Sequence, residues 1–263
     1  MTGGLTKHVD IPGQSLAGMR QPQARPQISI VVPMLNEIDA LPELLRHLSR
    51  LQPSARRPKD QHPERAYTIS HDIILVDGGS TDGTPQAARQ AGFRVVDSPK
   101  GRARQMNTGA SQARGDVLLF LHADTRLPNA GLEQITHALK GPSGWGRFDV
   151  RITGSAFMLK IVAQMMNLRS RITGIATGDQ AIFVDRVLFE SVGGFPDQPL
   201  MEDIELSSRL RQVCHPICLK AKVITSGRRW MDNGVWRTIF LMWRLRWAYW
   251  RGVSAEQLAK RYR

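Results

Sequence analysis

The chain has 263 residues, of which 36 are lysine or arginine and 23 are aspartate or glutamate, so its formal net charge is +13 at pH 7. This length suits one globular domain, and no apolar stretch reaches the roughly 18 uninterrupted residues of a membrane span. We therefore expect a single domain with decorated ends, and no integral membrane protein.

The strong positive charge suits nucleic acid, an anionic membrane surface or a phosphate-bearing substrate as partner. No RNA-recognition, zinc-finger or helix-turn-helix pattern accompanies the basic residues, so nucleic acid is the disfavoured partner. Two cysteines, Cys214 and Cys218, are too few for a disulfide framework and favour a reducing, cytoplasmic location. A zinc site on these cysteines and His215 is disfavoured, because such sites normally use four ligands.

The elements expected from the N-terminus are a tail, a strand, a helix and a loop. Residues 1–26 lack the apolar segment of a secretory signal and are rich in glycine, proline and glutamine, which predicts a disordered tail. Residues 28–35 form an apolar run that predicts a strand, and apolar residues at helical spacing follow over 38–48. Residues 52–66 carry prolines among charged residues and predict an exposed loop.

From residue 73 onward, strands and helices alternate. Strands are expected over 73–80, 93–99 and 116–124, and helices over 84–90 and 104–114. This alternation predicts an α/β fold with a mostly parallel sheet, doubly wound because its apolar strands need helices on both faces. Ligands bind such sheets at the carboxyl ends of the strands. The polar residues at these ends therefore become candidates for a site: Asn36, Glu37, Asp77, Asp97, His122 and Asp124.

The pattern beyond Asp124 is less regular. Residues 148–153 alternate like a half-buried strand, residues 155–170 have a helical, methionine-rich pattern, and residues 180–184 form another short apolar run. We expect this half to be an extension that receives a second substrate.

Two motifs, VVPMLNE at 31–37 and VDGGSTDGT at 76–84, carry the strongest signal. Together they resemble the family 2 glycosyltransferases, which implies a GT-A fold and a nucleotide-diphospho-sugar donor. The resemblance places four residues at the floor of the nucleotide pocket: Pro33, Asn36, Glu37 and Asp77. A strand-end carboxylate suits this role, because it accepts hydrogen bonds from a base N–H or from ribose hydroxyls. Alternatively, DGGSTDGT is a plain turn with a helix N-cap at Ser80 or Thr81.

The segment GRARQMN at 101–107 resembles the part of the family that lines the donor pocket, which implies this role for Arg104 and Asn107. The charges of Lys100 and Arg102 and a helix N-terminus would face the diphosphate beside them. The alternative is an ordinary solvated basic helix face.

The segment LLFLHADT at 118–125 ends where family members place an Asp-x-Asp metal motif. His122 stands in place of the first aspartate, whereas Asp124 keeps the last, which by resemblance coordinates a divalent cation, Mg²⁺ or Mn²⁺, on the diphosphate. One carboxylate suffices for a hard cation that takes its other ligands from phosphate and water. His122 would touch the ribose or bind a softer ion, or it is a structural histidine.

The segment MEDIELSSRL at 201–210 resembles the family's Glu-Asp motif, which implies Asp203 as the general base with Glu202 beside it. An inverting transfer needs one base to deprotonate the acceptor, while the cation and basic groups stabilise the departing diphosphate. Alternatively, these acidic residues only charge the first turn of a helix.

Two further segments, TGDQAIFV at 177–184 and SGRRW at 226–230, look like the acceptor side of the family. They imply acceptor contacts by Asp179, Gln180, Arg229 and Trp230. The glutamine that accompanies the Arg-Trp pair in processive members is absent, which disfavours polymer synthesis. The whole set of motifs is most similar to a compact subgroup described as radical-SAM/selenodomain-associated or arsenosugar-biosynthesis-type transferases.

Aromatic residues at steps of four and three near the C-terminus predict one stripe on a helix: Trp236, Phe240, Trp243, Trp247 and Trp250. Arg237, Arg244 and Arg251 form a basic line beside it. Such a helix either lies at a membrane interface or packs on the domain as core. We expect a tail at 1–26, a GT-A domain at 27–230 and an amphipathic helical segment at 231–263, with peripheral membrane contact through 235–251 as an open alternative.

The resulting hypothesis is an inverting, metal-dependent glycosyltransferase with a nucleotide-diphospho-sugar donor, a UDP-sugar first, and a small-molecule or lipid-linked acceptor. It would be cytoplasmic, with a peripheral position at the inner membrane face as an option. A sugar-phosphate nucleotidyltransferase is the alternative enzyme, but it would carry a glycine-rich basic loop where PMLNE has no glycine. A non-catalytic basic module that binds membrane or nucleic acid would need neither Asp124 nor Asp203.

Overall fold

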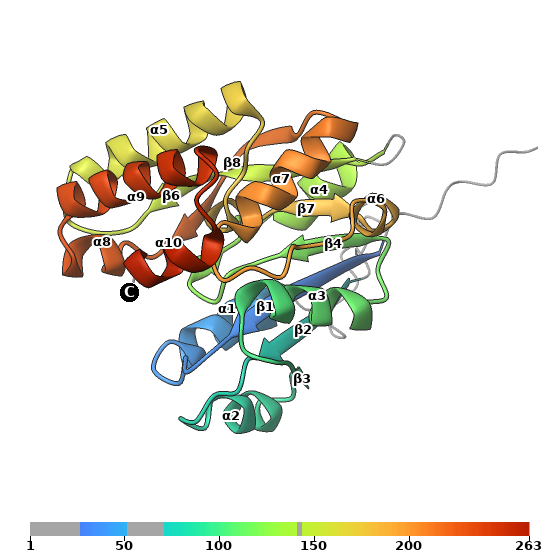
Figure 1. The fold of residues 1–263 in the computed structure, drawn as a ribbon. Coiled ribbons are helices and arrows are strands. Elements are labelled where there is room, and N and C mark those ends of the chain that lie inside the picture. Colours follow the sequence, from blue (N-terminus) through green and yellow to red (C-terminus); the bar gives the residue numbers. More distant parts are fainter. Residues whose placement is uncertain (1–26, 52–70, 141–143, 263) are drawn as a thin grey trace, which may run out of the picture.

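The computed structural model describes residues 27–51, 71–140 and 144–262. The predicted tail at 1–26 and the predicted loop at 52–66 lie outside the described residues. One eight-stranded sheet has the order β3-β2-β1-β4-β7-β6-β8-β5, and helices pack on both of its faces (Figure 1). The strands are β1 (Ile28–Met34), β2 (His71–Asp77), β3 (Arg94–Asp97), β4 (Val117–Phe120), β5 (Thr125–Arg126), β6 (Trp145–Ile152), β7 (Phe183–Asp185) and β8 (Ile217–Thr225).

The first half of the sheet is parallel, as the alternation of elements predicted. Strand β1 pairs in parallel with both β2 and β4, and β2 pairs in parallel with β3. The carboxyl ends of these strands therefore meet at one edge, where Met34 pairs with Asp77 and Asp77 with Asp97. The helices between and after them are α1 (Leu41–Leu51), α2 (Thr84–Gln90), α3 (Arg102–Gln112) and α4 (Gly131–Ala138).

The second half of the sheet mixes directions. Strand β7 is antiparallel to both β4 and β6, whereas β8 is parallel to β6 and antiparallel to β5. The sequence did not predict β8, which is mostly half-exposed. The helices of this half are α5 (Met158–Thr173), the short 3₁₀ helix η2 (Gly178–Gln180), α6 (Arg186–Ser191), α7 (Glu202–Val213), α8 (Arg228–Asp232), α9 (Val235–Trp250) and α10 (Ala255–Tyr262).

Strand β6 follows the predicted alternation over 150–153, where Arg151 and Thr153 are exposed and Val150 and Ile152 are buried, but Asp149 departs from it. Both Asp149 and Val150 are buried there, because β6 lies between two strands and α5 covers it. Asp149 is tolerated inside the protein because Arg147, which is fully buried, and Arg171 both form ion pairs with its carboxylate. Asp149 therefore belongs to an internal ion-pair cluster rather than to a solvent-exposed face of the strand.

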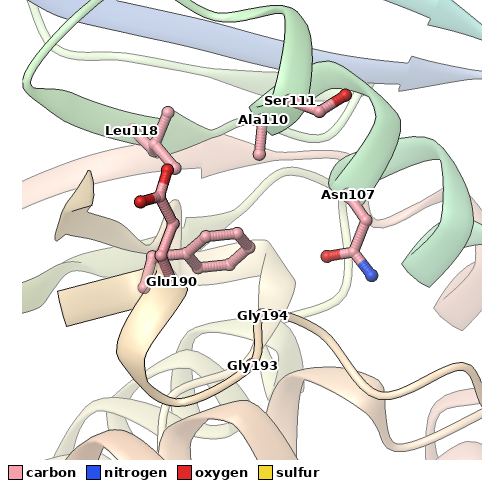
Figure 2. Close-up of a pocket in the computed structure, with 8 residues that line it drawn as sticks. Asn107, Ala110, Ser111, Leu118, Glu190, Gly193 and Gly194 are labelled. Atoms are coloured by element: carbon pink, nitrogen blue, oxygen red, sulfur yellow. The ribbon is translucent and has the colours of Figure 1, made fainter. Parts of the chain in front are cut away.

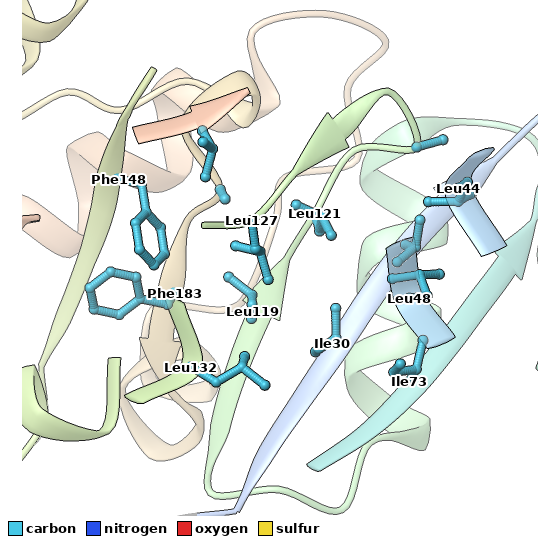
Figure 3. Close-up of a cluster of buried hydrophobic side chains, with 14 of the residues drawn as sticks. Ile30, Leu44, Leu48, Ile73, Leu119, Leu121, Leu127, Leu132, Phe148 and Phe183 are labelled. Carbon is cyan, nitrogen blue, oxygen red and sulfur yellow. The ribbon is translucent and has the colours of Figure 1, made fainter. Parts of the chain in front are cut away.

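Apolar cores lie on both faces of the sheet, since successive strand residues point to opposite sides. Ile30 of β1 belongs to the cluster that contains Leu44 and Leu48 of α1 (Figure 3), whereas Val31 belongs to the cluster beneath α3. Gly109 lets α3 approach closely, because a Cβ there would lie 2.3 Å from a methyl carbon of Val31. The continuous apolar strands of the sequence thus follow from cover on both faces.

The two C-terminal helices pack on the rest of the protein through small contacts. Leu245 and Ala248 of α9 and Leu258 of α10 form a third cluster with Met201. The predicted aromatic stripe is not part of it: its five side chains are 60 to 79% exposed. The alternative that this stripe packs as core is therefore wrong. Among the described residues, no helix has the length and apolar character needed to cross a bilayer.

Candidate active site

The ends of β1 and β2 are joined into one polar floor. Asp77 is buried, and its carboxylate accepts hydrogen bonds from the backbone N–H groups of Gly79 (2.9 Å) and Ser80 (3.0 Å) and from the Ser80 hydroxyl (2.5 Å). Asn36 donates its backbone N–H to the same hydroxyl at 2.8 Å, and its side-chain oxygen accepts from Thr81 N–H at 2.9 Å. These contacts hold the two predicted motifs together beside Pro33 of β1. Direct contacts of Pro33, Asn36 and Asp77 with a donor stay a prediction.

Glu37 and Asp124 bring two carboxylates close enough to interact electrostatically. Asp124 is exposed in the turn between β4 and β5. Burial raises the pKa of Glu37, and the negative charge of Asp124 raises it further. Two neighbouring carboxylates that repel each other suit a hard divalent cation, which prefers oxygen ligands. The described residues contain no group of three or more histidine, cysteine or acidic side chains able to hold a metal, so diphosphate and water would complete the ligand set.

His122 pairs with Asp179 rather than with Asp124. Its Nδ1 lies 3.5 Å from Asp179 Oδ1, and its Nε2 is buried without a hydrogen-bond partner in the described structure. The ring packs so closely on Gly178 that a Cβ at this glycine would lie 2.2 Å from it. Burial acts to raise the pKa of Asp179, but the hydrogen bond from His122 and the charges of Arg102 and Arg229 lower it below its usual range. His122 is thus packed against the loop that carries Asp179.

Asp203 lies in the first turn of α7, where the backbone holds its carboxylate. The N–H of Gly178 donates to Asp203 Oδ2 at 2.8 Å. Burial, followed by the charge of Glu202, raises the pKa of Asp203 to about 6. A carboxylate with a raised pKa is a better proton acceptor near neutral pH than an ordinary aspartate.

The pKa of Asp203 predicts a pH dependence. A general base must be ionised, so we expect kcat/KM to fall about tenfold per pH unit below pH 6 and to level off above it. A pH profile measured at saturating divalent cation, with stability checked at each pH, tests this. A profile that stays flat down to pH 4.5, about one and a half units below the expected midpoint, contradicts the assignment of Asp203 as base.

Arg102, rather than Arg104, reaches the acidic residues. Arg102 Nη1 lies 3.4 Å from Glu202 Oε1, and Glu202 is buried. Burial acts to lower the pKa of Arg102, but the charges of Glu202, Asp203 and Asp179 outweigh it and hold the pKa above its ordinary value. Since half of the Arg102 side chain remains exposed, its guanidinium is available to an anionic ligand as well.

Arg104 and Asn107 instead hold the loop before α7. Arg104 forms two hydrogen bonds with Asp197, at 2.7 and 2.9 Å, between exposed side chains. The Asn107 amide donates to the Phe195 carbonyl at 2.8 Å and accepts from the Phe195 N–H at 3.0 Å. Both side chains are thus occupied by protein partners in this structure. Their contact with a donor stays a prediction.

Asn107 also borders a pocket of about 270 Å³ between α3, α6 and the Gly193–Gly194 turn (Figure 2). Its walls include Leu118 and Phe189, and Glu190 is its acidic residue. None of the clustered side chains around Asp203 lines this pocket. The pocket is therefore separate from Asp203, the predicted general base.

The predicted acceptor residues differ in burial: one is inside the protein, and the others lie at least partly at its surface. Gln180 is fully buried, and its side-chain oxygen accepts the Thr177 N–H at 3.2 Å, which closes η2. Trp230 is half-buried against the main core cluster. Arg229 stacks on the ring of Tyr262, with 3.9 Å between its guanidinium carbon and the ring centroid. Acceptor contacts by these residues stay a prediction.

Tyr262 is a site residue that the sequence reasoning missed. Burial raises the pKa of its hydroxyl, and the charges of Arg229, Arg102, Asp179 and Asp203 all act on it. Helix α10 therefore ends beside the acidic cluster. No motif marks this tyrosine, because its place depends on α10 packing back over residues about 60 positions earlier in the chain.

Backbone strain also marks this region. Among the described residues, the non-glycine residues with a positive φ angle are Asn36 (54°), Ala181 (49°) and Met201 (65°). They adjoin Glu37, Gln180 and Glu202, respectively. Such conformations cost about 1 kcal/mol or more and concentrate at functional sites, so their distribution supports the location.

Comparison with known sequences identifies one protein family and a set of named relatives. The family described as Glycosyl transferase family 2 matches residues 29–161. An undecaprenyl-phosphate 4-deoxy-4-formamido-L-arabinose transferase of Pseudomonas fluorescens is 31% identical over 163 residues, which are 58% of this chain and 44% of that protein. The chain thus spans less than half the length of the first curated relatives that it matches.

Solved structures share the fold. The mannosyltransferase PcManGT of Pyrobaculum calidifontis, in complex with GDP-Man and Mn²⁺, superposes with a TM-score of 0.58 at 20% identity and covers 86% of this chain and 62% of its own. TarS 1–349 of S. aureus, in complex with UDP-GlcNAc, gives a TM-score of 0.57 at 20% identity over 76% of this chain and 58% of its own. The predicted GT-A fold is therefore confirmed.

Proposed function

Because the chain belongs to glycosyl transferase family 2, we propose that it is an inverting, metal-dependent glycosyltransferase that moves a sugar from a nucleotide-diphospho-sugar to an acceptor. The observation that carries the mechanism is Asp203: a carboxylate held by the Gly178 N–H, with a pKa raised to about 6, among Glu202, Arg102 and the His122–Asp179 pair. Family membership disfavours the two alternatives, a nucleotidyltransferase and a non-catalytic basic module.

In this mechanism Asp203 takes the proton of the acceptor nucleophile as the nucleophile attacks the anomeric carbon. The bond from that carbon to the nucleoside diphosphate breaks on the opposite face, so one displacement inverts the configuration. Arg102 lies near enough to the carboxylates to orient the acceptor or to stabilise the negative charge of the leaving group. The Gly178 N–H keeps Asp203 in place throughout.

A divalent cation, Mg²⁺ or Mn²⁺, fits the oxygen ligands at Asp124 and Glu37 and would supply positive charge to the diphosphate. Mn²⁺ in the complex of the related mannosyltransferase fold supports this part of the proposal. Because His122 is engaged with Asp179, Asp124 rather than His122 would be the cation ligand from the LHADT segment.

The donor base and the acceptor complete the proposal. We favour a UDP-sugar and a lipid-linked acceptor over a small molecule, since one relative is named for transfer to undecaprenyl phosphate. A protein of this kind would be cytoplasmic and touch the inner membrane face through residues 235–251, whose aromatic stripe is exposed. The relatives named above carry other names and do not support the radical-SAM or arsenosugar subgroup, so that finer assignment rests on the motifs alone.

We expect UDP to bind roughly tenfold or more tightly with Mn²⁺ than in excess chelator, because a cation held by Asp124 would supply positive charge to the diphosphate. Isothermal titration with a panel of nucleoside diphosphates and nucleotide sugars measures this and identifies the base. Equal affinities with and without the cation would contradict the metal assignment. Absence of binding by the whole panel would contradict the proposed donor class.

A further inference from the structure

A second exposed apolar stripe lies on α5, which the function proposed above does not use. It begins just before the helix and continues along one side at steps of four, four, three and four residues: Phe157, Ile161, Met165, Leu168 and Ile172. These side chains are 38 to 74% exposed, although the opposite side of the helix, with Leu159 and Val162, is buried in the core. A helix of a water-soluble domain normally turns polar residues outward, so this stripe requires an apolar partner.

The α9 stripe is of the same kind and contains four of the six tryptophans of the chain. Helices α5 and α9 pack on the same core cluster, through Leu159 and Val162 from α5 and Val235 and Ile239 from α9. Helix α8, which directly precedes α9, also approaches the segment before α5, because Met231 Sδ lies 4.0 Å from Ser155 Oγ. Figure 1 shows the two helices alongside each other at one end of the molecule. We call their ten exposed apolar side chains the α5/α9 surface.

The charged residues within the two helices of this surface are all basic. Neither α5 nor α9 contains an aspartate or glutamate. Basic residues flank both stripes, and exposed ones include Lys160, Arg237, Arg244 and Arg251. An apolar surface with tryptophans and a basic border matches a bilayer interface that carries anionic headgroups.

We propose that the α5/α9 surface docks the protein on an anionic lipid bilayer, with both helices lying in the interface. A second copy of the chain fits less well, because the basic borders of two such surfaces would repel each other. Residues 1–26 fit less well too, since they are rich in glycine, proline and glutamine and lack an apolar run to cover ten side chains. The bilayer offers both an apolar layer and negative charge.

Docking in this way would also bring the site close to a lipid-linked acceptor in the bilayer. This consequence rests on the proposed function. Helix α8 lies between the two regions: Met231, 47% exposed, borders the α5/α9 surface, and Arg229 lies against Tyr262 beside the acidic cluster. A phosphate at headgroup level would thus be close to Arg229.

The test is flotation of the full chain with vesicles of phosphatidylcholine, with and without phosphatidylglycerol. We expect binding to the anionic vesicles that weakens with salt, together with a blue shift of tryptophan emission. The double variants Trp243→Ser/Trp247→Ser on α9 and Met165→Ser/Leu168→Ser on α5 should each weaken binding roughly tenfold or more. Since these side chains are 51 to 65% exposed, the thermal midpoint of unfolding should stay near that of the wild type.

The matched control is Val187→Ser/Val213→Ser, which removes two exposed apolar side chains outside the α5/α9 surface and should bind like the wild type. Wild-type protein that floats with neither vesicle overturns the proposal. An α5 variant that binds normally while the α9 variant does not overturns the part played by α5. Wild-type dimers that dissociate in both variants, without lipid binding, make a second copy the occupant instead. Flotation needs no sugar donor, so it tests membrane docking even if the protein proves to transfer no sugar.

Discussion

Asp203→Asn is expected to reduce kcat for sugar transfer by roughly 10² to 10⁴ while changing donor affinity only a few-fold. The amide keeps the shape of the carboxylate and its acceptor oxygen for the Gly178 N–H. It loses the capacity to take a proton, so the loss should appear in turnover and not in ground-state binding. Single-turnover kinetics together with calorimetric titration of the donor separate the two effects.

Glu205→Gln is the matched control on the same helix. Its carboxylate faces Arg209 at 3.0 Å and the Tyr249 hydroxyl at 3.4 Å rather than the acidic cluster, so turnover should stay near the wild-type value. A second comparison is Glu202→Gln, which weakens the pairing with Arg102. If Asp203→Asn turns over normally and Glu202→Gln is inactive, the base is Glu202 and the proposed mechanism is wrong.

Asp203→Asn should also be more stable than the wild type at neutral pH. The pKa of Asp203 is higher in the folded protein than in the unfolded chain, so the folded protein binds the proton more tightly. Stability from this group is therefore present below pH 4 and is lost as the pH rises to about 6. Removing the buried charge should raise the free energy of unfolding at pH 7 by on the order of 1 to 3 kcal/mol, and the gain should vanish at low pH. Denaturant titrations at both pH values measure it.

Asp124→Asn is expected to lose cation and donor affinity together, unlike Asp203→Asn. An amide is a weaker ligand than a carboxylate for a hard cation, and Glu37 alone would be left near the diphosphate. We expect UDP affinity in Mn²⁺ to fall by roughly tenfold or more, toward the value measured with chelator. Titration of Mn²⁺ at fixed UDP reads the cation affinity directly.

Asp97→Asn is the control for this change, because Asp97 also ends a parallel strand and is exposed. Its carboxylate pairs with Arg89 at 2.8 Å, so its removal should leave Mn²⁺-dependent UDP binding unchanged. If Asp124→Asn binds UDP as the wild type does in Mn²⁺, Asp124 is not a metal ligand. Equal losses in both variants would indicate a general effect of negative charge at this edge of the sheet.

Local patterns in the sequence determined the first half of the fold. The apolar run over 28–35 became β1, and helical spacing over 84–90 became α2 with the same bounds. These elements were predictable because periods of two and 3.6 residues decide which side chains share a face. The strand-end rule then placed Asn36, Asp77 and Asp124 along one edge before any contact was known.

Only the tertiary structure decided how distant segments meet. Strand β8 has no strong period, and it forms because β6 offers it a parallel partner. The pairing of Arg102 with Glu202 joins residues 100 positions apart, and α10 brings Tyr262 to Arg229. The exposure of the aromatic stripe was likewise undecided in the sequence, because one amphipathic pattern suits both a core and a bilayer. Which of the two it contacts depends on what the rest of the chain leaves uncovered, and that is a property of long-range packing rather than of local periodicity.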